Sequence, residues 1–254
     1  MSALKLGAIH VPAPRAIRLL ADRARLSLMT PPKSADWFAK CPADGDPLGN
    51  DAVGDCVACA ELRAIQVRRA NAWGDAWRPT RDMAFGLYAA LTGFDPVTLL
   101  PDNGTDTALA MASWSASGIR IDDQNLDVVR WATVDPADAA HLAIAIGHTG
   151  PVQVTLALPT AAEDVAVWSQ PPGAGAGWQP GSWGCHRVMV GAFDGAGRVC
   201  RTWGQDVAIH PAFWAAYVVG VDAVLSREWM DATGLAPSGL DWDALDQDIA
   251  SLAG

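Results

Sequence analysis

A cysteine and a histidine about 130 residues apart in the chain are the pair best suited to chemistry. Cys56 follows the Gly-, Asp- and Pro-rich segment 41–55 and begins residues 56–73, a stretch without Gly or Pro that is predicted to be a helix. The unpaired N–H groups and partial positive charge of a helix N-terminus favour a thiolate and can also hold an oxyanion. A nucleophilic thiol needs a base, and His186, at the start of an apolar strand, is the candidate.

The elements that must position this pair run from helices to strands along the chain. Further helices are predicted at 80–92, with Thr80 as the cap, at about 105–117 and at 136–147. Strands are predicted at 151–158, in a hairpin of 186–194 with 198–204, and at 221–226, and a short helix is predicted at 241–252. This order predicts an α+β fold with two lobes, the helix of Cys56 in the first and His186 in the second.

The composition is that of an acidic globular protein. The chain has 254 residues, a formal net charge of −10 and 50% hydrophobic residues, with 12 tryptophans beside two tyrosines. Binding to phosphates or anionic lipids needs clustered Lys and Arg, so this balance argues against nucleic-acid and membrane partners. No stretch has the character of a signal peptide or a membrane-spanning helix, which predicts a cytoplasmic or virion-associated protein.

Several segments, taken in chain order, fit one known pattern. They are PPKSADW at 31–37, Gly54-Asp55-Cys56, DNGTD with the next helix and turn at 102–119, the helix and strand at 143–158, and HRVMVGAFDGAGRVCRTWG at 186–204. In this order they resemble the papain-like cysteine peptidases over about residues 30–225, in particular a divergent bacterial and phage-encoded branch. The resemblance implies a papain-like two-lobe α+β fold, with a helical lobe, an antiparallel β-rich lobe and a cleft between them.

The resemblance also implies a domain organisation. Residues 1–30 form an N-terminal arm, and residues 31–230 form the papain-like domain. Within that domain the helical lobe covers about 50–135 and the β-rich lobe about 150–225. Residues 231–254 form a C-terminal tail with a short helix.

The site residues follow from the same resemblance. Cys56 takes the place of the nucleophile and His186 that of the base, while Asn50 stands where the family has an oxyanion-stabilising Gln. The resemblance assigns the substrate site to four residues: Asn103, Gly104, Trp183 and Trp203.

The chain departs from the family pattern at Val57, where the family has an aromatic residue after the nucleophile, at Asn50, and at Arg201. Arg201 stands where the family has the Asn that orients the catalytic His, and an arginine cannot accept a hydrogen bond from imidazole. The orienting residue is therefore Thr202, or Gln205 or Asp206 just beyond it, or it is missing.

The five cysteines leave other interpretations open. Cys56-Val57-Ala58-Cys59 has the CxxC spacing of a redox pair, although the βαβ context of a thioredoxin-like site is absent. Cys56, Cys59, Cys185 and His186 together have the residue types of a zinc site, although the second pair is adjacent rather than spaced. Cys41, Cys59 and Cys200 are predicted to be structural, and Cys185 is a candidate for redox sensitivity.

Two functions of different classes fit these observations. The first is a papain-like thiol hydrolase without metal or cofactor, acting on a peptide, an isopeptide or a peptidoglycan cross-bridge. The second is a weakened or inactive papain-fold module that binds a protein partner, for example as a component of a phage particle, and the Arg at position 201 favours it. The sequence alone leaves open whether the site is active.

Overall fold

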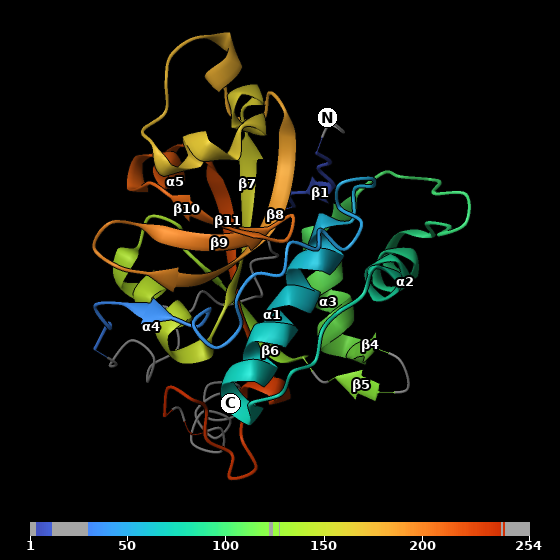
Figure 1. Cartoon of the computed structure of the whole chain (residues 1–254), viewed down its shortest axis with the longest axis vertical. Helices are drawn as coiled ribbons and strands as arrows, with labels where there is room; N and C mark the ends of the chain where they lie inside the picture. The colour runs from blue at the N-terminus through green and yellow to red at the C-terminus, as the bar shows by residue number, and fades with distance from the viewer. Residues whose placement is uncertain (1–3, 12–29, 122–123, 127, 240, 242–254) are drawn as a thin grey trace, which may run out of the picture.

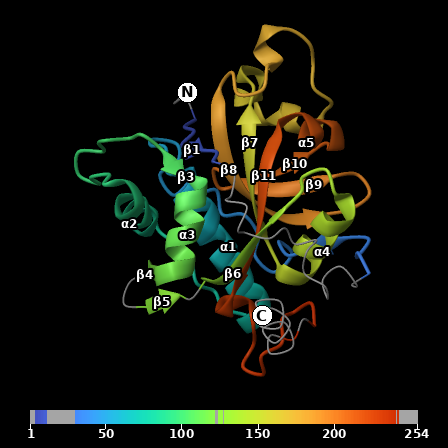
Figure 2. The same ribbon diagram turned by 180° about the vertical axis from the view of Figure 1, so that it is seen from behind.

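The structure is a computed structural model that describes residues 4–11, 30–121, 124–126, 128–239 and 241. Most of the arm predicted at 1–30 and nearly all of the helix predicted at 241–252 lie outside these residues. Helices α1–α3 gather on one side of the molecule and the main sheet lies on the other, as Figures 1 and 2 show from opposite directions. This is an α+β fold with two lobes, as the order of elements predicted.

Of the helices in the described residues, the first four agree closely with the sequence pattern, and the last was not predicted. They are α1 (Cys56–Trp73), α2 (Arg81–Thr92), α3 (Thr107–Ser117), α4 (Ala139–Thr149) and α5 (Pro211–Tyr217). Local capping explains where α2, α3 and α4 begin, because the side chains of Thr80, Asp106 and Asp138 each accept a hydrogen bond from a backbone N–H in the first turn. The starts of α3 and α4 are therefore two to three residues later than the pattern indicated.

The main sheet is antiparallel and has the strand order β10-β9-β8-β7-β11-β6. Its strands are β6 (Val128–Val134), β7 (Val152–Leu158), β8 (Gly184–Phe193), β9 (Arg198–Thr202), β10 (Gln205–Ile209) and β11 (Val218–Ser226), and β2 (Ala35–Asp36) pairs with β8. The hairpin β8–β9 and the strands β7 and β11 confirm the predicted strands. Strand β6 falls within the range predicted for the helical lobe, yet it pairs with β11 in this sheet.

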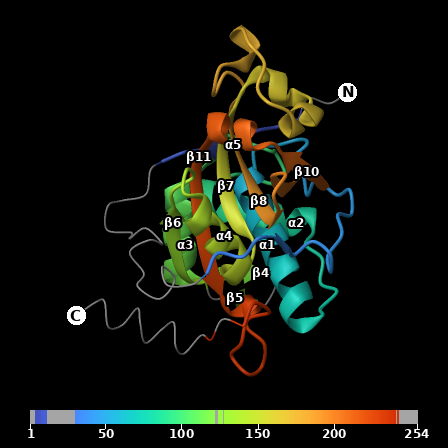
Figure 3. The same cartoon turned by 90° about the vertical axis from the view of Figure 1, so that its left-hand side faces the viewer.

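Four short strands complete the fold. β1 (Ala8–Ile9) pairs in parallel with β3 (Thr105–Asp106), and β4 (Ile119–Ile121) pairs with β5 (Gln124–Leu126). The loop from β7 to β8 holds three short 3-10 turns and rises above the rest of the molecule in Figure 3. β1 lies beside β8, so the N-terminal segment meets both lobes (Figure 1).

Helix α1 is the central element, and it is buried on nearly all sides. It packs against β8, and even its charged residues Glu61 and Arg68 are withdrawn from solvent. These two side chains form an ion pair of 3.0 Å, and Gln153 on β7 donates to Glu61 at 2.8 Å. A buried charge is stable only when it is paired, and the hydrogen bond from Gln153 joins the paired Glu61 of α1 to β7.

Candidate active site

Cys56 is the first residue of α1 and is buried. The turn of residues 48–55 leads to it, with Leu48 and Gly49 both at positive φ. The preceding residue, Asp55, occupies the N-cap position but makes no side-chain cap. The Cys56 Sγ accepts a hydrogen bond of 3.4 Å from the backbone N–H of Arg187 on β8. The helix N-terminus and the strand that carries His186 therefore meet at this thiol.

His186 lies on β8 and is fully buried. Its Nε2 and the Thr202 hydroxyl are 2.6 Å apart, and its ring stacks on Trp203 with centroids 4.2 Å apart and planes 8° apart. Trp183 in turn stacks on Trp203, at 6.0 Å. The other ring nitrogen, Nδ1, has no hydrogen-bond partner among the described residues. The imidazole is thus held at one nitrogen and one face, and its second nitrogen is free.

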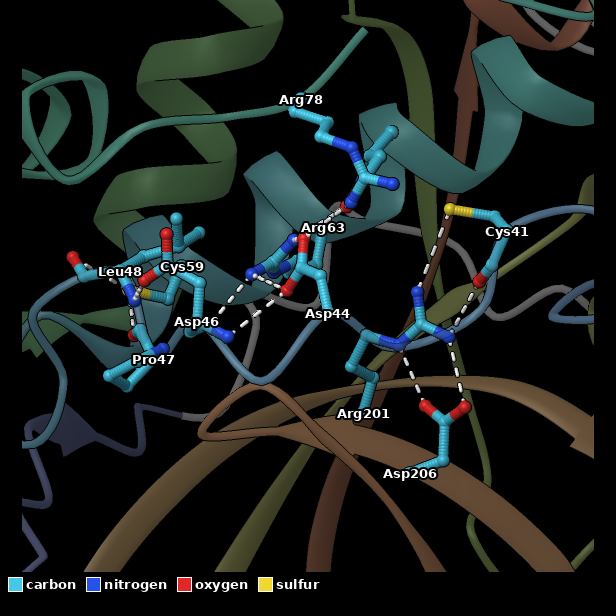
Figure 4. A network of polar contacts seen from close by, with 11 residues as sticks. Cys41, Asp44, Asp46, Pro47, Leu48, Cys59, Arg63, Arg78, Arg201 and Asp206 are labelled. Atoms are coloured by element: carbon cyan, nitrogen blue, oxygen red, sulfur yellow. Dashed lines mark hydrogen bonds and ion pairs between the residues drawn. The ribbon is translucent and has the colours of Figure 1, made fainter. Parts of the chain in front are cut away.

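Arg201 does not replace the missing Asn. Its guanidinium forms an ion pair with Asp206 at 2.7 Å and donates to the Cys41 carbonyl at 2.7 Å, as Figure 4 shows. Its hydrogen bonds therefore go to Asp206 and Cys41 rather than to the imidazole. Of the alternatives that the sequence left open, the structure puts Thr202 against His186, whereas the carboxylate of Asp206 is taken by Arg201.

Asn50 lies near Cys56, but its side chain already makes one hydrogen bond within its own loop. Its Nδ2 donates to the Val53 carbonyl at 3.1 Å, which uses one of the two amide hydrogens. Asn50, Cys56 and Thr202 line one small cavity of about 20 Å³. Residues 46–48 also line this cavity. Arg63 on α1 holds their loop in place, because it donates to Asp44 at 2.8 Å and to the Asp46 carbonyl at 2.6 Å (Figure 4).

Burial keeps the thiol and the imidazole uncharged in this structure. It raises the pKa of the Cys56 thiol to about 12 and lowers the pKa of His186 to about 3. The backbone N–H groups of Arg187 and Gly7 favour the thiolate and pull the pKa of Cys56 down, but less strongly than burial raises it. At neutral pH this arrangement holds a neutral thiol and a neutral imidazole.

The N-terminal segment of the chain reaches the Cys56 thiol. Residues 4–11 contain β1, and we call them the arm strand. The Gly7 amide lies against the Cys56 thiol, and the Gly7 carbonyl accepts from the Thr105 N–H at 2.6 Å. The fit at Gly7 is so close that an added Cβ would lie 1.7 Å from the Gly54 carbonyl oxygen. The arm strand therefore covers the thiol as an extended chain paired with β3.

A polar relay that sequence reasoning missed holds the loop across from Cys56. The Tyr88 hydroxyl donates to Asp102 at 2.8 Å and accepts from the Gly104 N–H at 2.9 Å, and Asp102 also accepts from the Gly54 N–H at 2.8 Å. This relay ties the loop of Gly104 to the residues before Cys56, while Asn103 is exposed at its tip. Tyr88 is one of only two tyrosines, but nothing in its local sequence indicates this role.

Comparison with known proteins finds matches among solved structures but none in the comparisons of sequence. No family model matches the chain, and no curated protein matches it in sequence. Among solved structures, xylellain, a cysteine protease from Xylella fastidiosa, matches with a TM-score of 0.60 and 14% identity, over 88% of this chain and 97% of that one. Procathepsin B S9 from Trypanosoma congolense matches with a TM-score of 0.60 and 11% identity, over 87% and 86%. The chain has a papain-like fold.

A plant enzyme matches in the same way. The cysteine protease CMS1MS2 of Carica candamarcensis, solved in complex with E-64, gives a TM-score of 0.53 at 13% identity and covers 76% of this chain and 98% of that one. In the papain-like fold of this chain, Cys56 and His186 lie on α1 and β8, the two elements that meet between the lobes.

The remaining cysteines of the papain-like domain are free thiols. Cys41 and Cys200 are buried, Cys59 lies one helical turn after Cys56, and Cys185 on β8 is half-buried. Within the described parts of the chain, no three His, Cys, Asp or Glu side chains come together in a way that could hold a metal ion, so the zinc interpretation has no support. None of the helices in those parts has the length and apolar character needed to cross a membrane.

Proposed function

We propose that the protein is a thiol hydrolase that cleaves peptide-type bonds, with Cys56 as the nucleophile and His186 as the base. The proposal rests on the hydrogen bonding of the His186 imidazole. Its Nε2 lies within hydrogen-bond distance of the Thr202 hydroxyl, and its Nδ1 has no hydrogen-bond partner among the described residues. The backbone N–H of Arg187, the residue after His186, donates a hydrogen bond to the Cys56 thiol. A base with one nitrogen anchored and one nitrogen available is what nucleophilic catalysis by a thiol needs.

Thr202 is proposed as the positioning residue of this pair. When its hydroxyl oxygen accepts from Nε2–H, the ring proton stays on Nε2 and the lone pair of Nδ1 can take the Cys56 proton. Trp203 stacks on the ring and covers it from water. The Thr202 hydroxyl therefore selects the imidazole tautomer with its proton on Nε2, which is the tautomer that an orienting amide would also select.

The reaction would run through an acyl-enzyme. The Cys56 sulfur attacks the carbonyl carbon, and the developing oxyanion is held by the Cys56 backbone N–H at the start of α1 and by the second amide hydrogen of Asn50. His186 gives its proton to the leaving amine, and water then attacks the thioester. In this account Thr202 acts only through His186.

The arm strand supports a peptide-like substrate. It is itself an extended peptide chain, and the backbone N–H of Thr105 binds its Gly7 carbonyl. A substrate backbone would use the same N–H, so it must displace the arm strand first. Displacement would also let water reach the pair, which favours the charged thiolate and imidazolium forms. The described structure then corresponds to a covered resting state.

Alkylation of the thiols by iodoacetamide tests the proposal. Gly7→Ala introduces the clash with Gly54 and should lift the arm strand, so we expect Cys56 to be labelled at least about tenfold faster at neutral pH than in the parent protein. Gly195→Ala is the matched control, because an added Cβ there meets nothing within 4 Å. Adding His186→Ala to the Gly7→Ala protein should abolish the gain.

Two results would overturn the proposal. One is slow labelling of Cys56 in Gly7→Ala, at the rate of the half-buried Cys185. The other is fast labelling that persists without His186. Either result would favour the inactive binding module. Hydrolysis of a mixed peptide library by Gly7→Ala, absent from its Cys56→Ala counterpart, would then establish the activity directly.

A further inference from the structure

Two thiols share the first turn of α1, since Cys56 is its first residue and Cys59 its fourth. A rise of about 1.5 Å and a rotation of about 100° per residue put the Cα atoms of such a pair about 5 Å apart. A disulfide accepts Cα separations of about 4.4–6.8 Å. We propose that Cys56 and Cys59 form a reversible disulfide, which blocks the nucleophile under oxidising conditions.

The surroundings leave Cys59 free to turn toward Cys56. Its Sγ makes two long contacts, 3.7 Å to the Pro47 carbonyl and 3.9 Å to the Leu48 carbonyl, in the loop that Figure 4 shows beside it, and it also lies against the Asp55 carboxylate. Both thiols line the same small cavity. Because the helix already supplies a suitable Cα separation, the bond requires rotation of the two side chains about their Cα–Cβ bonds.

Asp55 supplies a proton acceptor at the right place. Both of its carboxylate oxygens are buried, and the Cys59 thiol lies close enough to interact with them. Burial, and then the neighbouring charges of Asp55 and Cys56, raise the pKa of the Cys59 thiol, so the carboxylate and the two sulfurs lie close together. Hydrolysis as proposed above makes no use of this buried acid.

The chemistry balances with a peroxide as the oxidant. Attack of the Cys56 thiolate on hydrogen peroxide forms an S–O bond, breaks the O–O bond and, with one proton, releases water. The Cys59 sulfur then attacks the Cys56 sulfenic acid, Asp55 in its ionised form takes the Cys59 proton, the S–S bond forms, and the S–O bond breaks. The departing hydroxide takes up the proton as a second water. Two thiols lose two electrons, and the peroxide gains them.

The other three cysteines provide internal controls. Cleavage of the chain before every Asp gives the peptide 55–74, which holds Cys56 and Cys59 and no other cysteine. Cys41, Cys185 and Cys200 fall on the separate peptides 36–43, 164–193 and 194–205. A disulfide within 55–74 is therefore distinguished by mass from any other pairing in the molecule.

The test is oxidation of the whole protein, and of its Gly7→Ala variant in which the arm strand no longer covers Cys56, with hydrogen peroxide, followed by unfolding, alkylation of the remaining thiols and peptide mapping. We expect peptide 55–74 to lose about 2 Da, the mass of two hydrogens, and to resist alkylation until dithiothreitol restores it. The number of alkylated cysteines should fall from five to three. In Cys59→Ser, Cys56 should instead proceed to the irreversible sulfinic acid, whereas Cys185→Ser should behave as the parent protein does.

The inference is overturned if peptide 55–74 never shows the loss, or if Cys56 becomes linked to the peptide of Cys185. Its functional meaning rests on the proposed role of Cys56, but the mass measurement requires no hydrolysis. If Cys56 labelling proves independent of His186 while the disulfide still forms, only the proposed function fails. If labelling depends on His186 and the peptide stays reduced, only the disulfide proposal fails.

Discussion

Asp55 provides the sharpest test of the electrostatics of the site. It is fully buried beside Cys56 and Cys59, and burial raises its pKa from 3.8 to about 7. The folded protein therefore keeps a proton that the unfolded chain releases above about pH 4. Stability must fall as the pH rises between the two values, because the native state alone carries the proton. Asp55→Asn removes this cost and keeps the shape of the side chain.

The size of the effect follows from the two pKa values. Each pH unit between 3.8 and about 7 costs about 1.4 kcal/mol, so the parent protein should lose about 4 kcal/mol relative to Asp55→Asn over this range. Buried His186, with its lowered pKa, has the opposite dependence and loses stability as the pH falls. Both proteins contain His186, so its contribution cancels in the difference between them.

Urea unfolding followed by tryptophan fluorescence measures this difference, and the 12 tryptophans provide a strong signal. The free energy of unfolding is compared for the two proteins from about pH 4 to about pH 8. Asp51→Asn removes an exposed carboxyl from the same loop and should run parallel to the parent protein. If the free energies of unfolding of the parent protein and of Asp55→Asn also change in parallel with pH, to within about 1 kcal/mol, then Asp55 is solvated and the reasoning is refuted.

Three further predictions concern the contacts that support the site. In the Gly7→Ala background, Thr202→Val should slow the labelling of Cys56 by about tenfold, which is the effect of losing one hydrogen bond, and Thr202→Ser should restore the rate. Equal labelling rates for the Val and Ser variants would contradict the positioning role of Thr202. Glu61→Ala should cost about 3–5 kcal/mol in urea unfolding, because Arg68 is left buried without its partner, and a loss under about 1 kcal/mol would show that the pair is solvated. Tyr88→Phe should cost about 1–3 kcal/mol and speed proteolytic nicking near Gly104, and unchanged nicking would mean that the relay does not hold this loop.

Much of the local structure could be predicted from the sequence, because its causes lie within a few residues of one another. The 56–73 helix has no internal Gly or Pro, Thr80 caps α2, and the turn at 194–197 joins the β8–β9 hairpin. The position of Cys56 at a helix N-terminus follows from the same local signals. The resemblance to papain-like peptidases extended these signals to a fold, which the structural matches bear out.

The neighbours Arg201 and Thr202 show what a local pattern leaves undecided. Successive side chains of a strand point to opposite faces, so only one of the two can face His186. The choice depends on how β9 pairs with β8, and the register between them shifts at Val190 and Ala192. A shift of one residue exchanges the two faces, and nothing near 201–202 in the sequence encodes it.

By itself, the sequence determined the order of helices and strands, the helix N-terminus that carries Cys56 and the strand that carries His186. Only the tertiary structure decided that Thr202 meets the imidazole, that Glu61 and Arg68 pair inside the molecule, and that Gly7 covers the thiol. The physical reason is distance along the chain. Capping and turn formation act between residues a few positions apart, whereas these contacts depend on strand register and on segments that meet only when the lobes close around α1.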